Sequence, residues 1–328
     1  MNKLKAEKNE RPLLSFVLIA YNQEDFILDA IEGALSQSYS PLEIILSDDS
    51  SSDKTFSIMQ EVVADYEGPH RIILNKTPHN MGLGAHLNLA FNLCSGQLLI
   101  AAAGDDISTH QRVELLYEAW EQNNRPSMIC SGWSVIDRNG NISSQLAPQC
   151  SFEERAIAGD TNVSAIQSYL DGKPFDMVGA TAAYTKDLRN FRILDSNVVA
   201  EDFSLCLRAL LLNGIVCIKE PLVLYRRHSD NLSNVRGKKG ERFRRWSVLH
   251  SATFDCFYKD LKHAYELGSL SLLNFAYLGL QAKSWVASAA RMEKWNAVSF
   301  WCRAFYLSPY LFLIGSRRHK KFVINNIF

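Results

Sequence analysis

Four short polar segments carry the residue types that chemistry requires. Two are acidic, Ser-Asp-Asp-Ser-Ser-Ser-Asp at 47–53 and Gly-Asp-Asp at 104–106; a third is the acidic pair Glu201 and Asp202, and the fourth is Tyr-Arg-Arg-His at 225–228. Carboxylates bind hard divalent cations and can remove protons. Arginine and histidine side by side suit a diphosphate. Together these residue types indicate group transfer from a phosphorylated substrate.

The first acidic segment directly follows Leu42–Leu46, an apolar run of strand length. A carboxylate at the carboxyl end of a parallel strand points into the ligand crevice. We expect Asp49 to accept hydrogen bonds there from the edge of a base or from a ribose hydroxyl. The alternative is the start of a helix, where Ser and Asp are favoured. For Asp53 the two interpretations are equally supported.

The second acidic segment follows another apolar run, Leu98–Ala101, and places two adjacent carboxylates at its end. A divalent cation held by oxygen ligands commonly keeps diphosphate oxygens in its shell. A cation bound by Asp105 and Asp106 would neutralise a leaving diphosphate. Gly-Asp-Asp alone is also an ordinary turn, so its position at the end of a strand carries the prediction.

Two further groups lie in the second half of the chain. Glu201 and Asp202 begin a predicted helix with apolar residues below them, and either acid could act as a general base over the crevice. An acid at this point can instead simply oppose the helix dipole. Arg226 and His228 come with another arginine beside them, a setting that suits a diphosphate better than a core.

The elements that must position these groups alternate between strand and helix. Apolar runs predict strands near 14–19, 42–46, 72–74 and 98–101, and helical spacing predicts helices near 25–37, 53–66 and 84–94. This alternation predicts a doubly wound, mostly parallel α/β sheet. A helix at 112–122 and a strand at 128–136 should follow in a mixed region, and the pattern becomes helical beyond Gly240.

Composition limits the class of protein. The chain has 328 residues, 47% of them hydrophobic, and 35 basic residues balance 35 acidic ones, which argues against a general nucleic-acid binder. The seven cysteines show no metal-finger spacing and are expected to be reduced. We expect no signal peptide, and no run reaches the ~20 apolar residues of a membrane helix.

Taken in order, these motifs resemble those of the family 2 glycosyltransferases, which have the GT-A fold. The resemblance covers about residues 13–233. It rests on seven segments: Val17–Asn22, Leu35–Tyr39, Ser47–Asp53, Asn80–Gly84 with Asn88, Gly104–Asp106, Glu201–Asp202 and Tyr225–His228. One departure stands out, because many relatives have Asp-x-Asp at the metal site and the first position here is Gly104. The departure affects the identity and affinity of the metal.

The resemblance implies a role for each matching residue. Nucleotide-sugar contacts are implied for Tyr21, Asp49, Asn80, Gly82, Asn88, Asp105, Arg226 and His228. Asp106, with Asp105, would hold Mn²⁺ or Mg²⁺ on the diphosphate. Asp202, paired with Glu201, would remove the acceptor's proton in one displacement that inverts the anomeric centre. A uridine donor is favoured, with thymidine and guanosine as alternatives.

We divide the chain into an N-terminal segment at 1–12 that we expect to be disordered, a nucleotide-sugar-binding half at 13–108, an acceptor-binding half at 109–235 and a helical C-terminal region at 236–328. That last region carries two basic runs near several tryptophans, which suits an anionic membrane surface or a lipid-diphosphate acceptor. A solvated basic face is an equally good interpretation. The resemblance suggests a cytoplasmic enzyme, peripheral on the inner membrane, that builds O-antigen or capsule on a lipid-linked saccharide.

Three other classes of protein fit less well. A sugar-nucleotidyltransferase needs a glycine-rich loop after the first strand, and Ala20–Asp25 contains no glycine. A dinucleotide-dependent oxidoreductase needs Gly-x-Gly-x-x-Gly at that place, and Gly82-Leu-Gly84 is only a fragment elsewhere. A non-catalytic sugar-nucleotide-binding module would not need intact Asp49, Asp106 and Asp202.

Overall fold

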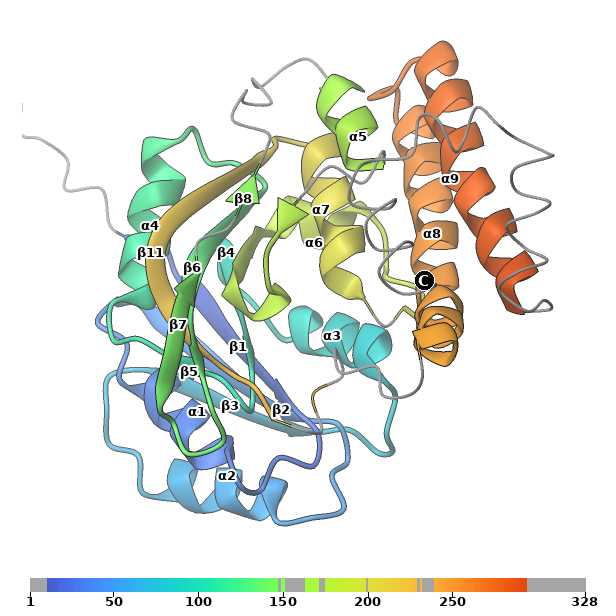
Figure 1. The fold of residues 1–328 in the computed structure, drawn as a ribbon. Helices are drawn as coiled ribbons and strands as arrows, with labels where there is room; N and C mark the ends of the chain where they lie inside the picture. The colour runs from blue at the N-terminus through green and yellow to red at the C-terminus, as the bar shows by residue number, and fades with distance from the viewer. Residues whose placement is uncertain are drawn as a thin grey trace, which may run out of the picture.

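A single mixed sheet forms the centre of the molecule. The computed structural model describes residues 11–146, 149–150, 163–170, 175–198, 200–228, 231 and 239–293. Within them a nine-stranded sheet has the order β3-β2-β1-β4-β10-β6-β11-β5, with β7 paired to β6. Helices cover both faces (Figure 1). Both predicted halves of the chain contribute strands to this sheet.

The first four strands are parallel and are joined by helices. They are β1 (Leu14–Ala20), β2 (Leu42–Asp48), β3 (Arg71–Lys76) and β4 (Leu98–Ala103), and the helices are α1 (Ile27–Leu35), α2 (Thr55–Ala64) and α3 (Leu83–Asn92). Every residue of β2 is buried, as a strand covered on both faces requires. The predicted parallel, doubly wound arrangement is confirmed for this half.

The second half inserts antiparallel strands. Its elements are β5 (Ile107–Ser108), α4 (Arg112–Gln122), β6 (Met128–Ile136), β7 (Ile142–Leu146), β8 (Gln149–Cys150), α5 (Val163–Leu170), β9 (Phe175–Asp176), the 3₁₀ turn η1 (Gly179–Thr181), β10 (Ala182–Thr185), α6 (Lys186–Phe191), α7 (Glu201–Leu211) and β11 (Ile215–Arg226). β10 is antiparallel to both β4 and β6, and β11 is parallel to β6. The ends of β4 and β11 therefore meet at the same edge of the sheet.

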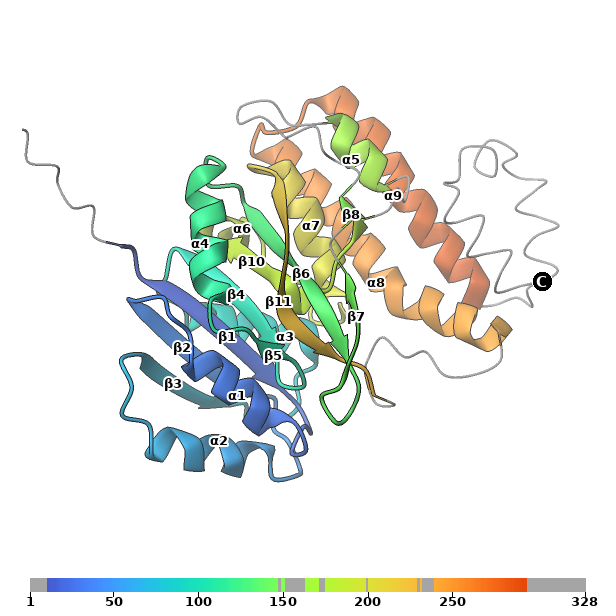
Figure 2. The same cartoon turned by 60° about the vertical axis from the view of Figure 1, so that its left-hand side comes forward.

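Two apolar layers hold the helices on the sheet. One contains residues of α1, α2 and α4 against one face, and the other contains residues of α3, α5, α7 and the C-terminal helices against the opposite face (Figure 2). β1 serves both layers, because Phe16 and Leu18 point to the first and Val17 to the second. This alternation fixes the register of β1 in the sheet.

The predicted helical C-terminal region is confirmed as far as the structure describes it. Helices α8 (Lys239–Glu266) and α9 (Leu272–Glu293) form an antiparallel pair, with α8 lying along α7 (Figure 1). Among the helices of the described residues, none has the length and apolar character needed to cross a bilayer. Of the segment at 1–12 that we expect to be disordered, residues 1–10 lie outside the described residues, as does the basic run at 317–321, whereas Arg11 and Pro12 are described.

Candidate functional site

Asp105 lies at the centre of a polar cluster at the strand ends. Its Oδ2 is 3.0 Å from Nε2 of His228 and 3.1 Å from Nδ2 of Asn231, and its carbonyl oxygen accepts a hydrogen bond from Nε of Arg226 at 3.0 Å. The structure thus brings the predicted residues Asp105, Arg226 and His228 together. Asn231 was not predicted. It also donates to the Arg226 carbonyl, which closes the turn after β11.

Asp106 is buried and carries an oxygen that no group satisfies among the described residues. Its Oδ1 accepts the backbone N–H of Arg226 at 2.9 Å, whereas its buried Oδ2 has no hydrogen-bond partner there. Burial raises the pKa of Asp106 well above its ordinary value, and the neighbouring Asp105 charge raises it further. An unsatisfied buried carboxylate oxygen beside a second carboxylate fits a divalent cation.

The described residues contain no group of three acidic, histidine or cysteine side chains able to enclose a metal ion. A cation at Asp105 and Asp106 would therefore complete its shell with oxygens from elsewhere. Diphosphate oxygens are the usual complement for Mg²⁺ in proteins. Metal binding at Asp105 and Asp106 stays a prediction.

Gly104 is confined by the residues around it. A Cβ atom placed on Gly104 would lie 2.3 Å from Oε1 of Gln23 and 2.8 Å from Cβ of Ala20. An aspartate at this position would have to displace both neighbours. Steric crowding therefore accounts for the glycine that departs from the family's pattern.

Arg226 connects several elements of the candidate site. It is 2% exposed, and its guanidinium donates to Asp29 Oδ2 at 2.7 Å and to the Arg138 carbonyl at 2.9 Å while lying over the Phe26 ring. Through these contacts Arg226 links the ends of β4 and β11 to helix α1. Direct contact of its guanidinium with a diphosphate stays a prediction.

Asp49 shapes the loop that leads into α3. Its carboxylate accepts hydrogen bonds from the backbone N–H of Met81 at 2.9 Å and of Gly82 at 3.0 Å, and from Oγ1 of Thr77 at 3.0 Å. Gly82 has a φ of +77°, which suits glycine, and Oδ1 of Asn80 also accepts from its N–H. This geometry brings Asp49 against the loop that contains Asn80 and Gly82.

Three more predicted positions can be located. Tyr21 is 46% exposed just after β1, where its ring is open to a ligand. Asp53 accepts from the N–H and hydroxyl of Thr55 at the start of α2, as in the helix-start interpretation. The amide of Asn88 both donates to and accepts from the Leu194 backbone. Asn88 thereby holds the segment before α7, and its nucleotide contact stays a prediction.

Glu201 and Asp202 stand in the first turn of α7, over η1. A Cβ on Gly179 would lie 2.9 Å from Oε1 of Glu201 and 3.3 Å from Cβ of Asp202, so glycine makes room for both acids. Burial raises the pKa of Asp202 to about 6. Burial and the nearby Asp202 charge raise the pKa of Glu201 to about 8. Near neutral pH one acid can thus be ionised while its neighbour holds a proton.

Arg112 connects β4 to η1, the turn that lies against Glu201 and Asp202. This fully buried residue of α4 donates to the carbonyls of Ala101 at 2.7 Å and Ala180 at 2.6 Å, and to Oγ of Ser108 at 2.9 Å. Burial lowers its pKa to about 9, so it remains cationic at neutral pH. Its contacts fix η1 relative to the end of β4. The sequence gives no sign of this role, since a buried arginine looks like a surface residue of an amphipathic helix.

A match to a known family shows which family the chain belongs to. The model of the family "Glycosyl transferase family 2" matches residues 15–190, more than half of the chain. The protein is a member of family 2 of the glycosyltransferases. The matched range includes the loop at 47–53, Asn88 and the Asp105–Asp106 pair, and it ends before Glu201 and Arg226.

Individual relatives match over shorter stretches. EpsE of Bacillus subtilis, a protein named as a glycosyltransferase, is 33% identical over 140 residues, which cover 43% of this chain and 50% of EpsE. The chondroitin synthase of Escherichia coli is 33% identical over 133 residues, covering 40% of this chain and 19% of that protein. The matches therefore span half or less of the length of these relatives.

Solved structures share the fold of this family 2 member at low identity. TarS 1–349 of S. aureus in complex with UDP-GlcNAc has a TM-score of 0.55 at 17% identity and covers 95% of this chain and 79% of TarS 1–349. The mannosyltransferase PcManGT of Pyrobaculum calidifontis in complex with GDP-Man and Mn²⁺ has a TM-score of 0.52 at 14% identity, with 97% and 87% covered. The likeness confirms the predicted GT-A-like fold.

The raised pKa of Glu201 predicts a stability effect for Glu201→Gln. The pKa of Glu201 is about 8 in the folded protein, against an ordinary 4.5. As pH rises between these values, Glu201 ionises in the unfolded chain but stays protonated in the folded one, so the folded protein loses stability. We expect the melting temperature of the variant, relative to wild type, to rise steadily from pH 5 to pH 8.5. Calorimetry across this range, with Glu24→Gln as the exposed control, checks it. A difference that is independent of pH would contradict the assigned burial.

Proposed function

We propose that the protein is an inverting glycosyltransferase that moves a sugar from a nucleotide diphosphate-sugar to an acceptor hydroxyl. The observation that carries this proposal is the buried, unsatisfied carboxylate oxygen of Asp106 beside Asp105, at the strand edge where Asp49 also lies. Membership of family 2 supports it, as do the nucleotide-sugars bound by TarS and PcManGT in the same fold.

The residues would divide the work between donor and acceptor. The nucleotide would lie between Tyr21 and the loop that Asp49 holds, with His228 on the phosphate side. Asp105 and Asp106 would hold Mn²⁺ or Mg²⁺, which offsets the charge of the leaving diphosphate when bound. Removal of the acceptor's proton falls to Asp202. Attack on the anomeric carbon from the opposite face then inverts that centre in one displacement.

The pKa of Asp202 suits this role. A general base works best when its pKa lies near the working pH, because it is then ionised and still basic. Burial raises the pKa of Asp202 to about 6. Asp202 is therefore ionised at neutral pH and a stronger base than an ordinary aspartate.

Uridine is the donor base that we favour. TarS, which shares the fold, binds UDP and UDP-GlcNAc, whereas PcManGT binds GDP-Man. The deciding experiment is thermal stabilisation by UDP, GDP, dTDP, CDP and NAD, each with Mn²⁺ or with chelator. A ligand at ~100 times its dissociation constant adds about 2.7 kcal/mol. Stabilisation by one nucleoside diphosphate only with metal supports the proposal, and stabilisation by none of them, or by NAD, overturns it.

We propose a saccharide on a lipid carrier as the acceptor, in the synthesis of a surface polysaccharide such as O-antigen or capsule. The similarity to a chondroitin synthase supports a polysaccharide product. Contact with the cytoplasmic face of the inner membrane fits this acceptor. Leu273, Tyr277 and Leu280 on α9 are 82%, 59% and 71% exposed, and the sequence places basic runs at 236–245 and 317–321. Apolar and basic groups together suit an anionic lipid surface.

The membrane contact predicts a defined loss of binding. Replacing Leu273 and Leu280 together with Glu should release the protein from phosphatidylglycerol vesicles in a sedimentation assay, because the apolar anchor is lost and negative charge is repelled. Ile142→Glu is the matched control, since Ile142 is 60% exposed on β7. Binding that survives the double substitution, or is lost equally in the control, contradicts a lipid contact at α9.

A further inference from the structure

Helix α8 contributes one fully buried carboxylate, Asp260, to the interior next to α7. Its Oδ2 accepts a hydrogen bond from Nε of Arg208 at 2.8 Å, and its Oδ1 accepts from Nη2 of Arg208 at 3.2 Å and from Nε of Arg192 at 2.7 Å. Asp260 is 0% exposed and Arg208 is 1% exposed. One buried acid thus binds a buried arginine and a partly exposed one, and geometry decides whether such charges stabilise each other.

The two arginines belong to the structure that carries the acidic pair. Arg208 lies on α7, the helix that begins with Glu201 and Asp202. Arg192 begins the segment that leads into α7, and its Nη1 donates to Asp195 at 2.8 Å. The guanidinium of Arg208 also donates to the Arg192 carbonyl. Asp260 therefore binds both α7 and the segment that precedes α7.

The lead-in segment is held on its other side by α3. Both polar atoms of the Asn88 amide bond the Leu194 backbone, at 2.8 and 3.0 Å. A Cβ on Gly84 would lie 2.7 Å from the Asp195 carbonyl oxygen, so the two backbones are in close contact. Because α3 starts in the loop that Asp49 holds, residues 192–198 are fixed between the donor side and α8.

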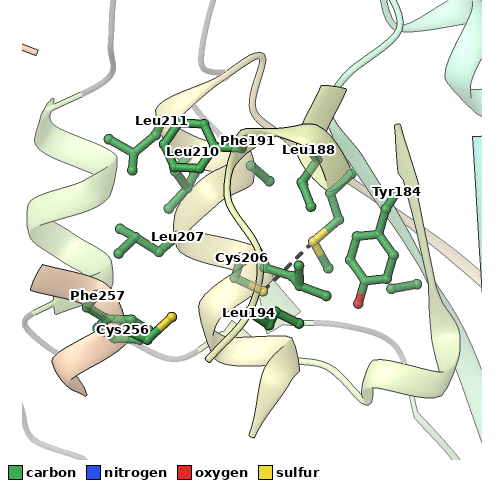
Figure 3. Packing of buried hydrophobic residues seen from close by; sticks show 14 of the residues in the cluster. Tyr184, Leu188, Phe191, Leu194, Cys206, Leu207, Leu210, Leu211, Cys256 and Phe257 are labelled. Carbon is green, nitrogen blue, oxygen red and sulfur yellow. Dashed lines mark hydrogen bonds between the residues drawn. The ribbon is translucent and has the colours of Figure 1, made fainter. Parts of the chain in front are cut away.

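Apolar packing alone does not fix the position of α7 along α8. Leu207, Leu210 and Leu211 of α7 lie in one apolar cluster with Phe257 of α8 (Figure 3). Such contacts are non-directional. The paired hydrogen bonds from Arg208 to Asp260 are directional, and they define one rotation and one height of α7. Lys259, next to Asp260, adds an ion pair to Asp195 at 2.7 Å.

We propose that Asp260 is a positioning residue for glycosyl transfer, which sets the place of Asp202 through Arg208 and Arg192. The inference rests on the proposed function of Asp202 as the base. Asp260 lies about 70 residues beyond the range matched by the family model, which ends at 190. The C-terminal helix pair is accordingly a working part of the catalytic unit of this chain, in addition to any role at a membrane.

Asp260→Asn in the full-length protein tests the proposal. The amide cannot balance two guanidinium groups, so α7 should shift and release of UDP from UDP-GlcNAc should fall, by about 10–100-fold if the displacement approaches 1 Å. Binding of UDP with Mn²⁺, measured by calorimetry, should stay unchanged. Asp255→Asn is the matched control, since the Asp255 side chain on the same helix is half-exposed and forms an ion pair with Lys259 at 2.7 Å. Unchanged release in Asp260→Asn, or an equal loss of UDP affinity, overturns the proposal.

Hydrogen–deuterium exchange gives a readout that needs no turnover. Amides of residues 192–204 should exchange faster in Asp260→Asn, while those of β1 and β2 stay protected as in wild type. If Asp260→Asn does not fold, Arg192→Lys replaces it, because it keeps the charge and removes the forked contact; faster exchange and slower release are again expected. Wild-type protein that binds UDP with Mn²⁺ but releases none from UDP-GlcNAc or from other UDP-sugars counts against the proposed function, and the exchange result still decides the role of Asp260.

Discussion

Asp202→Asn will lower the rate of sugar transfer by about 10²–10⁴-fold while leaving nucleotide binding intact. Asparagine has the same shape and can still accept the hydrogen bond from the Phe203 N–H, which the Asp202 Oδ1 accepts at 2.9 Å. It cannot take a proton from the acceptor. The variant should therefore keep the helix start and lose only the base.

The pH dependence of the wild-type enzyme tests the same assignment. Because the pKa of Asp202 is raised to about 6, the base is protonated and inactive below that value. kcat/KM should rise with pH through about 6 and then level off, and this limb should disappear from the residual activity of Asp202→Asn. Loss of UDP binding in the variant, or an unchanged limb, would remove Asp202 from the role.

The second large effect is expected at Asp106. In Asp106→Asn the metal loses its buried carboxylate, so Mn²⁺-dependent stabilisation by UDP should vanish, a change of about 2.7 kcal/mol at 100 times the wild-type dissociation constant. The protein without ligand should be no less stable than wild type. The Oδ2 of Asp106 has no hydrogen-bond partner among the described residues, so none is lost there. Asparagine removes a buried carboxyl group and can still accept the hydrogen bond from the Arg226 N–H.

A matched control for Asp106 exists in the segment after β2. Asp53 also follows a buried strand, but its carboxylate bonds Thr55 at the start of α2. Asp53→Asn should leave metal-dependent stabilisation unchanged. If both variants lose it equally, or if Asp106→Asn binds UDP and Mn²⁺ normally, the metal does not lie at Asp106.

The order of strands along the first half could be predicted because local signals suffice there. Each of β1, β2 and β4 is mostly apolar, and the two acidic motifs follow the ends of β2 and β4. The place of β10 between β4 and β6 could not be predicted, because it depends on pairing with strands that lie far away in the sequence, as Ala183 pairs with Ile100 and with Ile129. Short strands such as β5 have too few residues to show a period.

The acidic residues of the site were predictable, whereas the residues that hold them were not. Asp49, Asp105 and Asp106 stand next to strands, and Glu201 and Asp202 begin a helix, so position in the sequence reveals them. Asn231 becomes significant only when β11 brings it to Asp105, which lies 126 residues earlier. Arg112 and Asp260 look like surface charges in sequence, and only their burial shows that they join separate elements.

The long separation between Asp106 and Arg226 has a consequence for synthesis of the chain. A ribosome that has released residues up to 190 has made β1 to β4 and both Asp105 and Asp106, but not β11. Until β11 pairs with β5, which directly follows Asp106, the Arg226 N–H and the side chains of His228 and Asn231 are absent from the candidate site. Synthesis of β11 is therefore the step that completes this polar cluster, and a polypeptide that ends before β11 lacks part of the set of groups that we propose for donor binding.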